Sequence, residues 1–413
     1  MSPEVGTDDF IPLLFASDIN VYSMARAFHE EYGCRAVSYG MANTGPCVDS
    51  RILEHRVRER ADRPTVMLEL INAFAQEHPE QTVIVVCCGD SYVRSLAQIR
   101  PALAANVVAP GISPELLDRL TNKERFYELC NEVGLDYPST FIYREQGTSA
   151  DDIPFELPWV IKPADGVQYW EHPFEQQDKV FIAKTRADAD SILKRIYSSG
   201  YTASTIIQDF IPGDDSFMRV LTNYSDTKGQ VKLMCLGHVL LEEHTPKGKG
   251  NHAVIITEQD LELEARFKQL LEKLGYTGFS NFDLKFDSRD GRMKVFECNV
   301  RQGRSNFYVT GAGANLAKTL VDDLVYRRDL AFCSMDEQAL WMVVPEKVAF
   351  DYINPVPCRA KMRELIAAGR CTNPLLYKGD RSVKHRLRVE KSLHTQHDKF
   401  ARFYGEHRYQ GQD

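Results

Sequence analysis

The 413-residue sequence lacks the features that mark membrane, secreted and nucleic-acid-binding proteins. Its longest apolar runs, such as VIVVCC at 83–88, are much shorter than the roughly 20 residues that cross a bilayer. The N-terminal segment has neither the basic start nor the long apolar stretch of a secretory signal peptide. A net charge of −8 argues against general binding to nucleic acid. These absences predict a soluble protein with no membrane span and no nucleic-acid partner.

Cysteine pairs suited to zinc are absent as well, since no two cysteines are spaced as CxxC. The ten cysteines are scattered and several lie in apolar runs, which is typical of reduced cytosolic thiols rather than of a disulfide framework. We therefore expect a cytoplasmic protein, with Cys87 and Cys88 packed in a core. The chain length favours two or three domains, and 43% hydrophobic with 26% charged residues is typical of a globular fold.

The first 118 residues predict a small α/β domain. The strand-like runs FIPLLFAS, TVIVVCCGD and ANVVAPGI alternate with helical segments, the first of them from about Val21 to Tyr32. TVIVVCCGD is an unbroken apolar run of the kind found in buried parallel strands. It ends in Gly89 and Asp90, at the strand end where open α/β sheets bind ligands, although a plain turn explains these two residues equally well.

Residues 119–330 predict a second domain, and residues 331–413 a C-terminal extension with weaker signals. Thr121 or Asn122 is expected to cap a helix that runs to Val133 and ends at Gly134. The strand LPWVIKP, which carries Lys162, begins a subdomain over about 157–212. The sequence contains no internal repeat and no low-complexity segment.

A hairpin with one polar face is predicted around Arg289–Gly291. In FECNVRQGRSNF, Glu297, Asn299 and Arg301 occupy alternate positions and therefore share one face of a strand. The upstream run SNFDLKFDSRDGRMKV pairs with it if Gly291 is left-handed in a three-residue loop. This register opposes Ser288 to Arg292 and Asp283 to Glu297. One face then holds Asp283, Lys285, Val295, Glu297, Asn299 and Arg301, and the other holds Phe282, Leu284, Phe286, Phe296 and Cys298.

The polar face indicates a metal site. Two opposed carboxylates repel each other unless a cation lies between them. The oxygens of Asp283, Glu297 and Asn299 suit Mg²⁺, which commonly also binds substrate phosphates, and Lys285 and Arg301 suit those phosphates. The alternative is a surface hairpin held by salt bridges. A glycosidase acid pair is remote, because directly opposed carboxylates with an Asn ligand fit a metal better than a sugar.

With these residues in view, the sequence resembles the ATP-grasp superfamily of carboxylate–amine ligases, and within it the D-aspartate ligases. The resemblance covers nearly the whole chain and is densest in FIPxLxxSDxNVYxMARxF, QDFIPGDDSxMRVL, MCLGHxLLE, YTGFxNFD and RQGRSxF. It implies an α/β ATP-grasp fold. In that fold, 1–118 is a Rossmann-like pre-ATP-grasp domain, 119–330 the ATP-grasp domain, and 157–212 a lid-like subdomain.

The resemblance also implies a role for individual residues. ATP is expected to contact the lysines Lys123 and Lys162, the adenine-reading hinge Gln208, Asp209, Phe210 and Ile211, and the ribose-binding Asp215. The metal ligands are expected to be Asp283, Glu297 and Asn299. The γ-phosphate and the acyl substrate are expected near Arg301, Arg219, Arg304 and Ser305. His238 and His252 flank the loop EEHTPKGKGN, which either covers the site or is an ordinary loop.

Two departures from the superfamily pattern are visible. Gln208 stands where many members have Glu, and the segment ADGVQYW is poor in glycine where many members cover the phosphates with a glycine-rich loop. The residues that cover the phosphates therefore stay unassigned.

The activity implied by the resemblance is ATP- and Mg²⁺-dependent amide formation. The side-chain carboxylate of D-aspartate is expected to become an acyl phosphate that the lysine ε-amino group of a UDP-linked muramyl peptide, UDP-MurNAc-pentapeptide, attacks in peptidoglycan synthesis. Lys384, Arg386 and Arg388, in the basic last stretch, form either a solvated helical face or a site for a polyanionic substrate or an anionic membrane surface. Two alternatives stay open: a ligase with a different acid and amine, and a non-catalytic nucleotide-binding protein.

Overall fold

The computed structural model describes residues 4–246 and 248–409, and these divide into two compact units. Unit 1 comprises Met1–Leu117, Met218–Asn281 and Asn299–Asp413. Unit 2 comprises Asp118–Phe217 and Phe282–Cys298. Among the described residues, no helix combines the length and the apolar character that a bilayer crossing requires.

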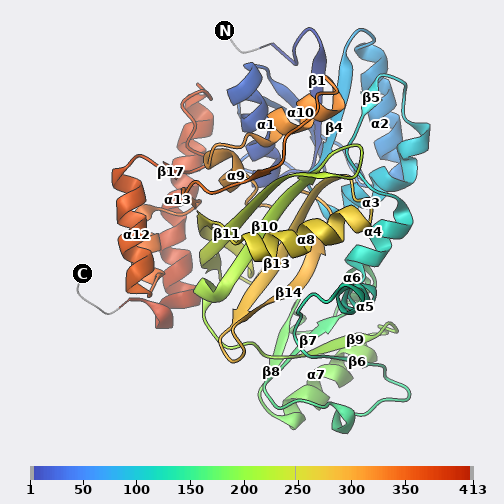
Figure 1. The fold of residues 1–413 in the computed structure, drawn as a ribbon, viewed down its shortest axis with the longest axis vertical. Coiled ribbons are helices and arrows are strands. Elements are labelled where there is room, and N and C mark those ends of the chain that lie inside the picture. The colour runs from blue at the N-terminus through green and yellow to red at the C-terminus, as the bar shows by residue number, and fades with distance from the viewer. Residues whose placement is uncertain (1–3, 247, 410–413) are drawn as a thin grey trace. The chain divides into compact units, whose positions relative to one another are not determined.

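Unit 1 begins with a parallel five-stranded sheet in the order β3-β2-β1-β4-β5 (Figure 1). The strands are β1 (Phe10–Phe15), β2 (Ala36–Gly40), β3 (Leu53–Val57), β4 (Thr82–Cys87) and β5 (Val107–Val108), with helices α1 (Ile19–Tyr32), α2 (Pro64–Glu77) and α3 (Asp90–Ile99) between them. The α/β character predicted for these residues is confirmed, although only Val107–Val108 of the run ANVVAPGI forms a strand. Because β1 and β4 are neighbours and their crossovers run in opposite directions, their carboxyl ends form the switch point where such sheets bind ligands.

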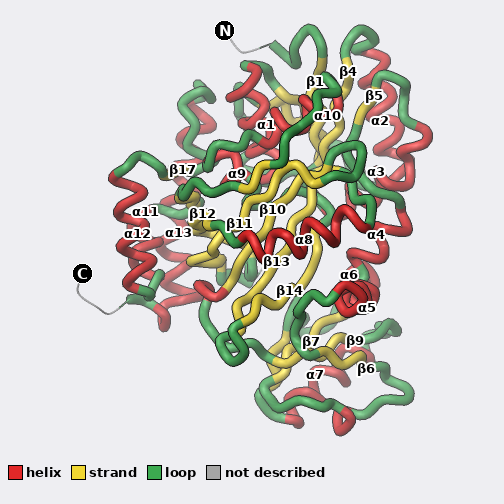
Figure 2. Tube along the Cα trace, viewed as in Figure 1, coloured by secondary structure: helices red, strands yellow, loops and turns green. Residues whose placement is uncertain are grey.

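A second, eight-stranded sheet has the order β14-β13-β10-β11-β12-β16-β17, with β15 beside β11 (Figure 2). Its strands are β10 (Met218–Ser225), β11 (Val231–Glu243), β12 (Asn251–Glu258), β13 (Gly278–Asp287), β14 (Arg292–Asn299), β15 (Cys333–Ser334), β16 (Leu340–Met342) and β17 (Cys371–Thr372). Helix α8 (Leu261–Lys273) crosses one face of this sheet in Figure 1, with Leu263, Phe267, Leu270 and Leu271 buried. The residues after 331 thus supply three strands to the sheet.

The remaining helices of unit 1 are α9 (Phe307–Gly311), α10 (Leu316–Leu324), α11 (Glu346–Tyr352), α12 (Val356–Ala367) and α13 (Val383–Tyr404). One apolar core joins β11, β12 and β16 to α11, α12 and α13; its members include Leu241, Val254, Val348, Met362 and Phe400. The C-terminal residues are therefore packed on the central sheet by buried side chains.

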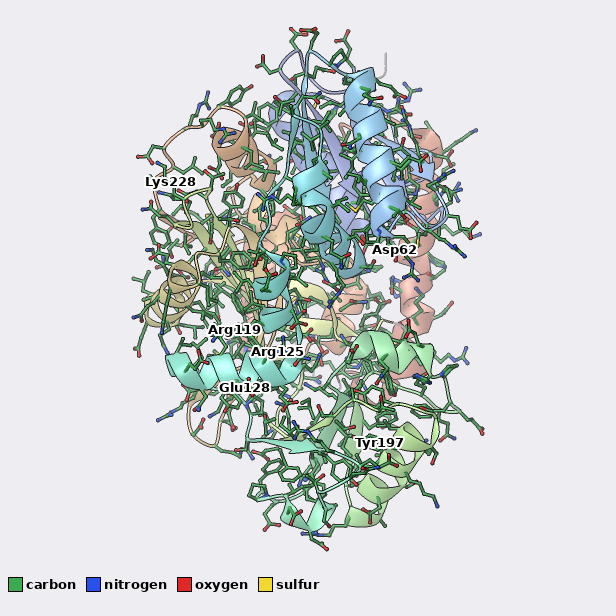
Figure 3. All side chains as sticks on the ribbon, turned by 90° about the vertical axis from the view of Figure 1, so that its right-hand side faces the viewer. Asp62, Arg119, Arg125, Glu128, Tyr197 and Lys228 are labelled. Carbon is green, nitrogen blue, oxygen red and sulfur yellow. The ribbon has the colours of Figure 1, made fainter. Side chains whose placement is uncertain are left out.

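Unit 2 is built on an antiparallel sheet in the order β6-β9-β7-β8. Its elements are β6 (Thr140–Tyr143), β7 (Trp159–Pro163), β8 (Phe181–Ala183), β9 (Thr205–Asp209), α5 (Lys123–Val133), α6 (Gly166–Glu171) and α7 (Arg186–Ser198), while α4 (Pro114–Thr121) spans the start of the unit. Tyr197 of α7, labelled in Figure 3, belongs to the apolar core with Trp159 and Ile207.

Helix α5 forms where its caps predict. The side chain of Asn122 accepts a hydrogen bond from the Arg125 N–H, and Gly134 ends the helix in the left-handed region, with φ 70°. These caps place Lys123 in the first helical turn.

Candidate active site

The hairpin of β13 and β14 brings the two predicted carboxylates together, but with a different turn. Strand β13 ends at Asp287 and β14 begins at Arg292, so the predicted three-residue loop with Ser288 opposite Arg292 is wrong. Gly291 is left-handed, with φ 71°, and its N–H donates to the Asp287 carbonyl oxygen at 2.8 Å. The Asp287 carboxylate accepts from the backbone and side chain of Arg289 at 3.1 and 2.9 Å, which closes the turn one residue earlier.

The predicted separation of polar and apolar faces is also only partly right. Val295, expected on the polar face, is buried, whereas Phe296, expected in the core, is half-buried. The Nζ of Lys162 lies 4.9 Å from the centroid of the Phe296 ring. The backbone of β14 is held by two long-range bonds, from the Val295 N–H to Asp136 O at 2.9 Å and from the Tyr127 hydroxyl to Phe296 O at 2.8 Å.

Asp283 and Glu297 are in hydrogen-bond contact, surrounded by the side chains of three lysines. Lys123 Nζ lies 3.6 Å from Glu297 Oε2, and Lys162 and Lys179 act on the same carboxylate. Burial alone would raise the pKa of Glu297, but the three ammonium groups and the contact with Asp283 lower it to about 2. The Glu297 carboxylate is therefore ionised throughout the physiological pH range.

The same cluster changes Lys162. Burial lowers its pKa, and the neighbouring Lys123 and Lys179 ammonium groups lower it further against the opposing effect of Glu297 and Asp283, to about 8. Excess positive charge in a buried position favours an anionic ligand such as a phosphate. The sequence analysis did not find Lys179: it is an exposed residue in the segment before β8, and no local pattern distinguishes it from other surface lysines.

The residues present fit Mg²⁺ by their donor chemistry. The Asp283 and Glu297 carboxylates supply oxygen atoms, and Asn299 ends the same strand two positions after Glu297. In the described parts of the chain, no group of three or more His, Cys, Asp or Glu side chains could hold a metal ion. A cation bound by this set would complete its coordination with phosphate and water oxygens, as Mg²⁺ commonly does.

The predicted adenine hinge lies at the end of β9. Gln208 is buried and its Nε2 donates to Thr140 Oγ1 at 2.9 Å. The Asp209 carboxylate accepts two hydrogen bonds from Arg289, at 3.2 and 2.6 Å, so its side chain is engaged within unit 2. Phe210 and Ile211 follow the strand, and Asp215 begins a short 3₁₀ turn that ends at Phe217.

In unit 1, Arg301 is held at the switch point of the five-stranded sheet. Its Nε and Nη2 donate to the two carboxylate oxygens of Asp90 at 2.7 and 2.9 Å. Nη2 also lies 3.5 Å from Asn299 Oδ1. Asp18, after β1, is half-buried; the loss of hydration raises its pKa, while Arg304 and Arg301 lower it. Asp90 is thus a partner of a predicted catalytic arginine rather than a plain turn residue.

A buried amide network fixes the segment that carries these arginines. Asn20 Nδ2 donates to Cys88 O at 3.1 Å and to Gln302 O at 3.2 Å. Asn306 Nδ2 donates to Asn20 Oδ1 at 2.8 Å. These bonds anchor residues 302–306 to α1 and to the end of β4. Arg219 lies in a separate group, where its Nε donates to Glu258, whose other oxygen is 3.6 Å from His238 Nδ1.

Comparison with solved structures identifies the fold. An N5-carboxyaminoimidazole ribonucleotide synthetase in complex with ADP is 14% identical, with a TM-score of 0.61 over 97% of this chain and all of that one. The L-amino acid ligase of Bacillus licheniformis is 17% identical, with a TM-score of 0.53 over 76% of this chain and 73% of that one. The fold is that of the ATP-grasp enzymes, as predicted.

Sequence comparison is more specific. A scan against protein-family models gives no match. The D-aspartate ligase of Enterococcus faecium (strain Aus0004), however, is 39% identical over 416 aligned residues, which cover 98% of this chain and 99% of that enzyme. The chain belongs to the D-aspartate ligase family, and it is an ATP-dependent carboxylate–amine ligase.

Proposed function

We propose that the enzyme uses Mg²⁺-ATP to activate the side-chain carboxylate of D-aspartate as an acyl phosphate. We further propose that it transfers this acyl group to the lysine ε-amino group of a peptidoglycan precursor, UDP-MurNAc-pentapeptide. The choice of D-aspartate rests on full-length similarity to an enzyme named D-aspartate ligase. The observation that carries the chemistry is the contact of Asp283 with Glu297 among three lysine side chains.

The nucleotide end of the reaction is assigned to the residues around Asp283 and Glu297. The ammonium groups of Lys123, Lys162 and Lys179 would neutralise the phosphates, because they already concentrate positive charge around Glu297. Mg²⁺, held by Asp283, Glu297 and Asn299, would supply charge neutralisation and orientation of the phosphates. We assign adenine and ribose recognition to the backbone of 208–211 and to Asp215.

The acyl end is assigned to Arg301, Arg304 and Arg219. Arg301 already binds a carboxylate through two parallel N–H donors, in its pair with Asp90. The same donors suit a substrate carboxylate or a transferring phosphoryl group, whose negative charge they would stabilise. A substrate carboxylate oxygen attacks the γ-phosphorus and ADP leaves; the amine then attacks the acyl carbon and phosphate leaves with the electrons of the C–O bond.

An acyl-phosphate trap tests this proposal. The enzyme is incubated with Mg²⁺-ATP, hydroxylamine and either D- or L-aspartate, and hydroxamate and ADP are measured. We expect hydroxamate with D-aspartate, its loss in Glu297→Gln, and its retention in Glu128→Gln, a matched change at an exposed position of α5 (Figure 3). The absence of hydroxamate from the wild type with D-aspartate, also when UDP-MurNAc-pentapeptide is present, would refute it.

A further inference from the structure

Three polar side chains of unit 1 form a hydroxyl–imidazole–carboxylate series that the assignment above does not use. The Oγ of Ser305 lies 3.3 Å from Nδ1 of His252, and Nε2 of His252 lies 3.8 Å from Oε1 of Glu242. The His252 side chain is 8% exposed and that of Glu242 is 15% exposed, while Ser305 is 3% exposed. The series is therefore largely shielded from solvent, with Ser305 at one end.

The sheet is irregular at the point where it presents this pair. Glu242 of β11 and His252 of β12 are direct partners across the two strands. The register shifts between Val239 and Leu241 and again between Leu241 and Glu242. Such bulges change the direction of side chains and are frequent next to active sites. Here they immediately precede the carboxylate that faces His252.

Ser305 connects the series to the acyl end of the site. It lies one residue after Arg304 and four after Arg301, in the segment that the Asn20 network anchors. His252 is thus bonded to the same short segment that carries the arginines assigned to the acyl substrate.

The order of groups gives the imidazole a direction for proton transfer. When the Ser305 hydroxyl donates to Nδ1, the imidazole proton resides on Nε2 and points toward the Glu242 carboxylate. A proton accepted at Nδ1 produces an imidazolium that Glu242 stabilises. The same logic activates the hydroxyl in serine hydrolases. His238 lacks this arrangement, because its carboxylate partner, Glu258, also binds Arg219.

The proposed reaction needs such a proton acceptor. An unperturbed lysine ε-amino group has a pKa of about 10.4 and is therefore almost wholly protonated at neutral pH. It attacks an acyl phosphate only as the free amine, and the nitrogen must lose another proton when the amide forms. The phosphoryl-transfer half of the reaction has no such requirement.

We propose that His252, oriented by Glu242, accepts the proton of the attacking amine through the hydroxyl of Ser305. This inference rests on the proposed function. The lysine ammonium group first gives one proton to water; the nitrogen–carbon bond then forms as an N–H proton of the free amine passes to the Ser305 oxygen and the Ser305 proton passes to His252 Nδ1. The carbon–oxygen bond to phosphate breaks, phosphate leaves with the electron pair, and the imidazolium releases its proton to phosphate or water.

The test compares two nucleophiles on one acyl phosphate. Hydroxylamine is already a free base at pH 8 and reacts with acyl phosphates without an enzymatic catalyst, whereas the lysine amine of UDP-MurNAc-pentapeptide is mostly cationic. For His252→Gln we expect hydroxamate formation to stay within about threefold of wild type, and amide formation to fall by about 100-fold or more. Glu242→Gln should show the same selective loss to a smaller degree, and Ser305→Ala should lower amide formation more than hydroxamate formation. His394→Gln, a matched change at an exposed position of α13, should alter neither rate.

The outcomes distinguish a failure of this proton relay, from the amine through Ser305 to His252, from a failure of the proposed function. Equal loss of hydroxamate and amide in all three variants would make the series a structural link and overturn the relay, as would normal amide formation in His252→Gln. If the wild type makes no hydroxamate from D-aspartate, the proposed function fails, whatever the variants do.

Discussion

Nucleotide binding is predicted to take up a proton at alkaline pH, and the proton is expected to bind to Lys162. Burial and the ammonium groups of Lys123 and Lys179 lower the pKa of Lys162 to about 8 in the ligand-free protein. A phosphate placed beside this ammonium group favours its charged form and raises the pKa again. Nucleotide binding therefore protonates the fraction of Lys162 that is neutral in the free protein.

The size of the effect follows from the fraction of Lys162 that is neutral before binding. With a pKa of about 8, roughly one tenth is neutral at pH 7, half at pH 8 and nine tenths at pH 9. If the bound phosphate restores the ordinary lysine value, uptake approaches about 0.5 proton per site at pH 8 and about 0.9 at pH 9. Affinity should then fall by up to about tenfold per pH unit above pH 8.

The assay is titration calorimetry with ADP and a chelator, so that no metal cation alters the field at Lys162. ADP is fully ionised at pH 8 and above, and therefore contributes no proton of its own. Repeating the titration in buffers with different ionisation enthalpies gives the number of protons bound. Lys162→Arg is the matched variant, because arginine keeps the charge but stays protonated across this range.

Two results would refute this reasoning. Proton uptake near zero at pH 9 in the wild type, with ADP bound, would mean that Lys162 is charged before binding or does not meet the phosphates. Uptake of the same size in Lys162→Arg would mean that another group titrates.

Three further predictions concern other parts of the chain. Glu297→Gln should abolish turnover, while the far-ultraviolet circular dichroism spectrum and the unfolding transition stay native-like, because the half-buried side chain mainly balances the lysine charges. Retained turnover would contradict the role of Glu297 as a metal ligand. Burial raises the pKa of Glu264 above 4.5, so the contribution of this residue to stability is present at low pH and is lost as the pH rises through the raised value. Glu264→Gln should therefore increase the free energy of unfolding by on the order of 1 kcal/mol relative to wild type at pH 8, but by little at pH 4. Thermal melts measure this difference, and a difference independent of pH would be evidence of another cause. Replacing Lys384, Arg386 and Arg388 by Gln should raise KM for the UDP-linked acceptor several-fold with KM for ATP unchanged, and unchanged acceptor kinetics would leave them as a solvated face.

Local signals in the sequence predicted the elements that local chemistry determines. Asn122 and Gly134 define α5 because a side-chain cap and a left-handed glycine act within a few residues. The apolar run of β4 and the alternation of residues around Glu297 predicted these two strands in the same way. Asp283 was placed opposite Glu297 by counting from a three-residue loop that the structure does not have, but the two side chains are in contact.

The features that the sequence did not predict depend on partners far along the chain. Arg289 closes its turn with Asp287 and also binds Asp209, which no local turn rule includes. Phe296 faces Lys162, so an aromatic residue on the expected core face became part of the polar cluster. Strands such as β17, Cys371–Thr372, are too short to show any periodicity.

The glycine-poor segment after Lys162 has a structural explanation that also accounts for Lys179. Instead of a flexible loop, this segment forms α6, capped by the Asp165 carboxylate, which accepts from Gln168 N–H at 3.1 Å. Tyr169 of α6 is fully buried and its hydroxyl donates to Asp178 O at 2.7 Å, directly before Lys179. Backbone N–H groups of a glycine-rich loop can approach phosphates only where side chains are missing. Here a packed tyrosine holds the backbone next to Lys179, whose ammonium group acts on the Glu297 carboxylate, so this part of unit 2 supplies positive charge from a side chain.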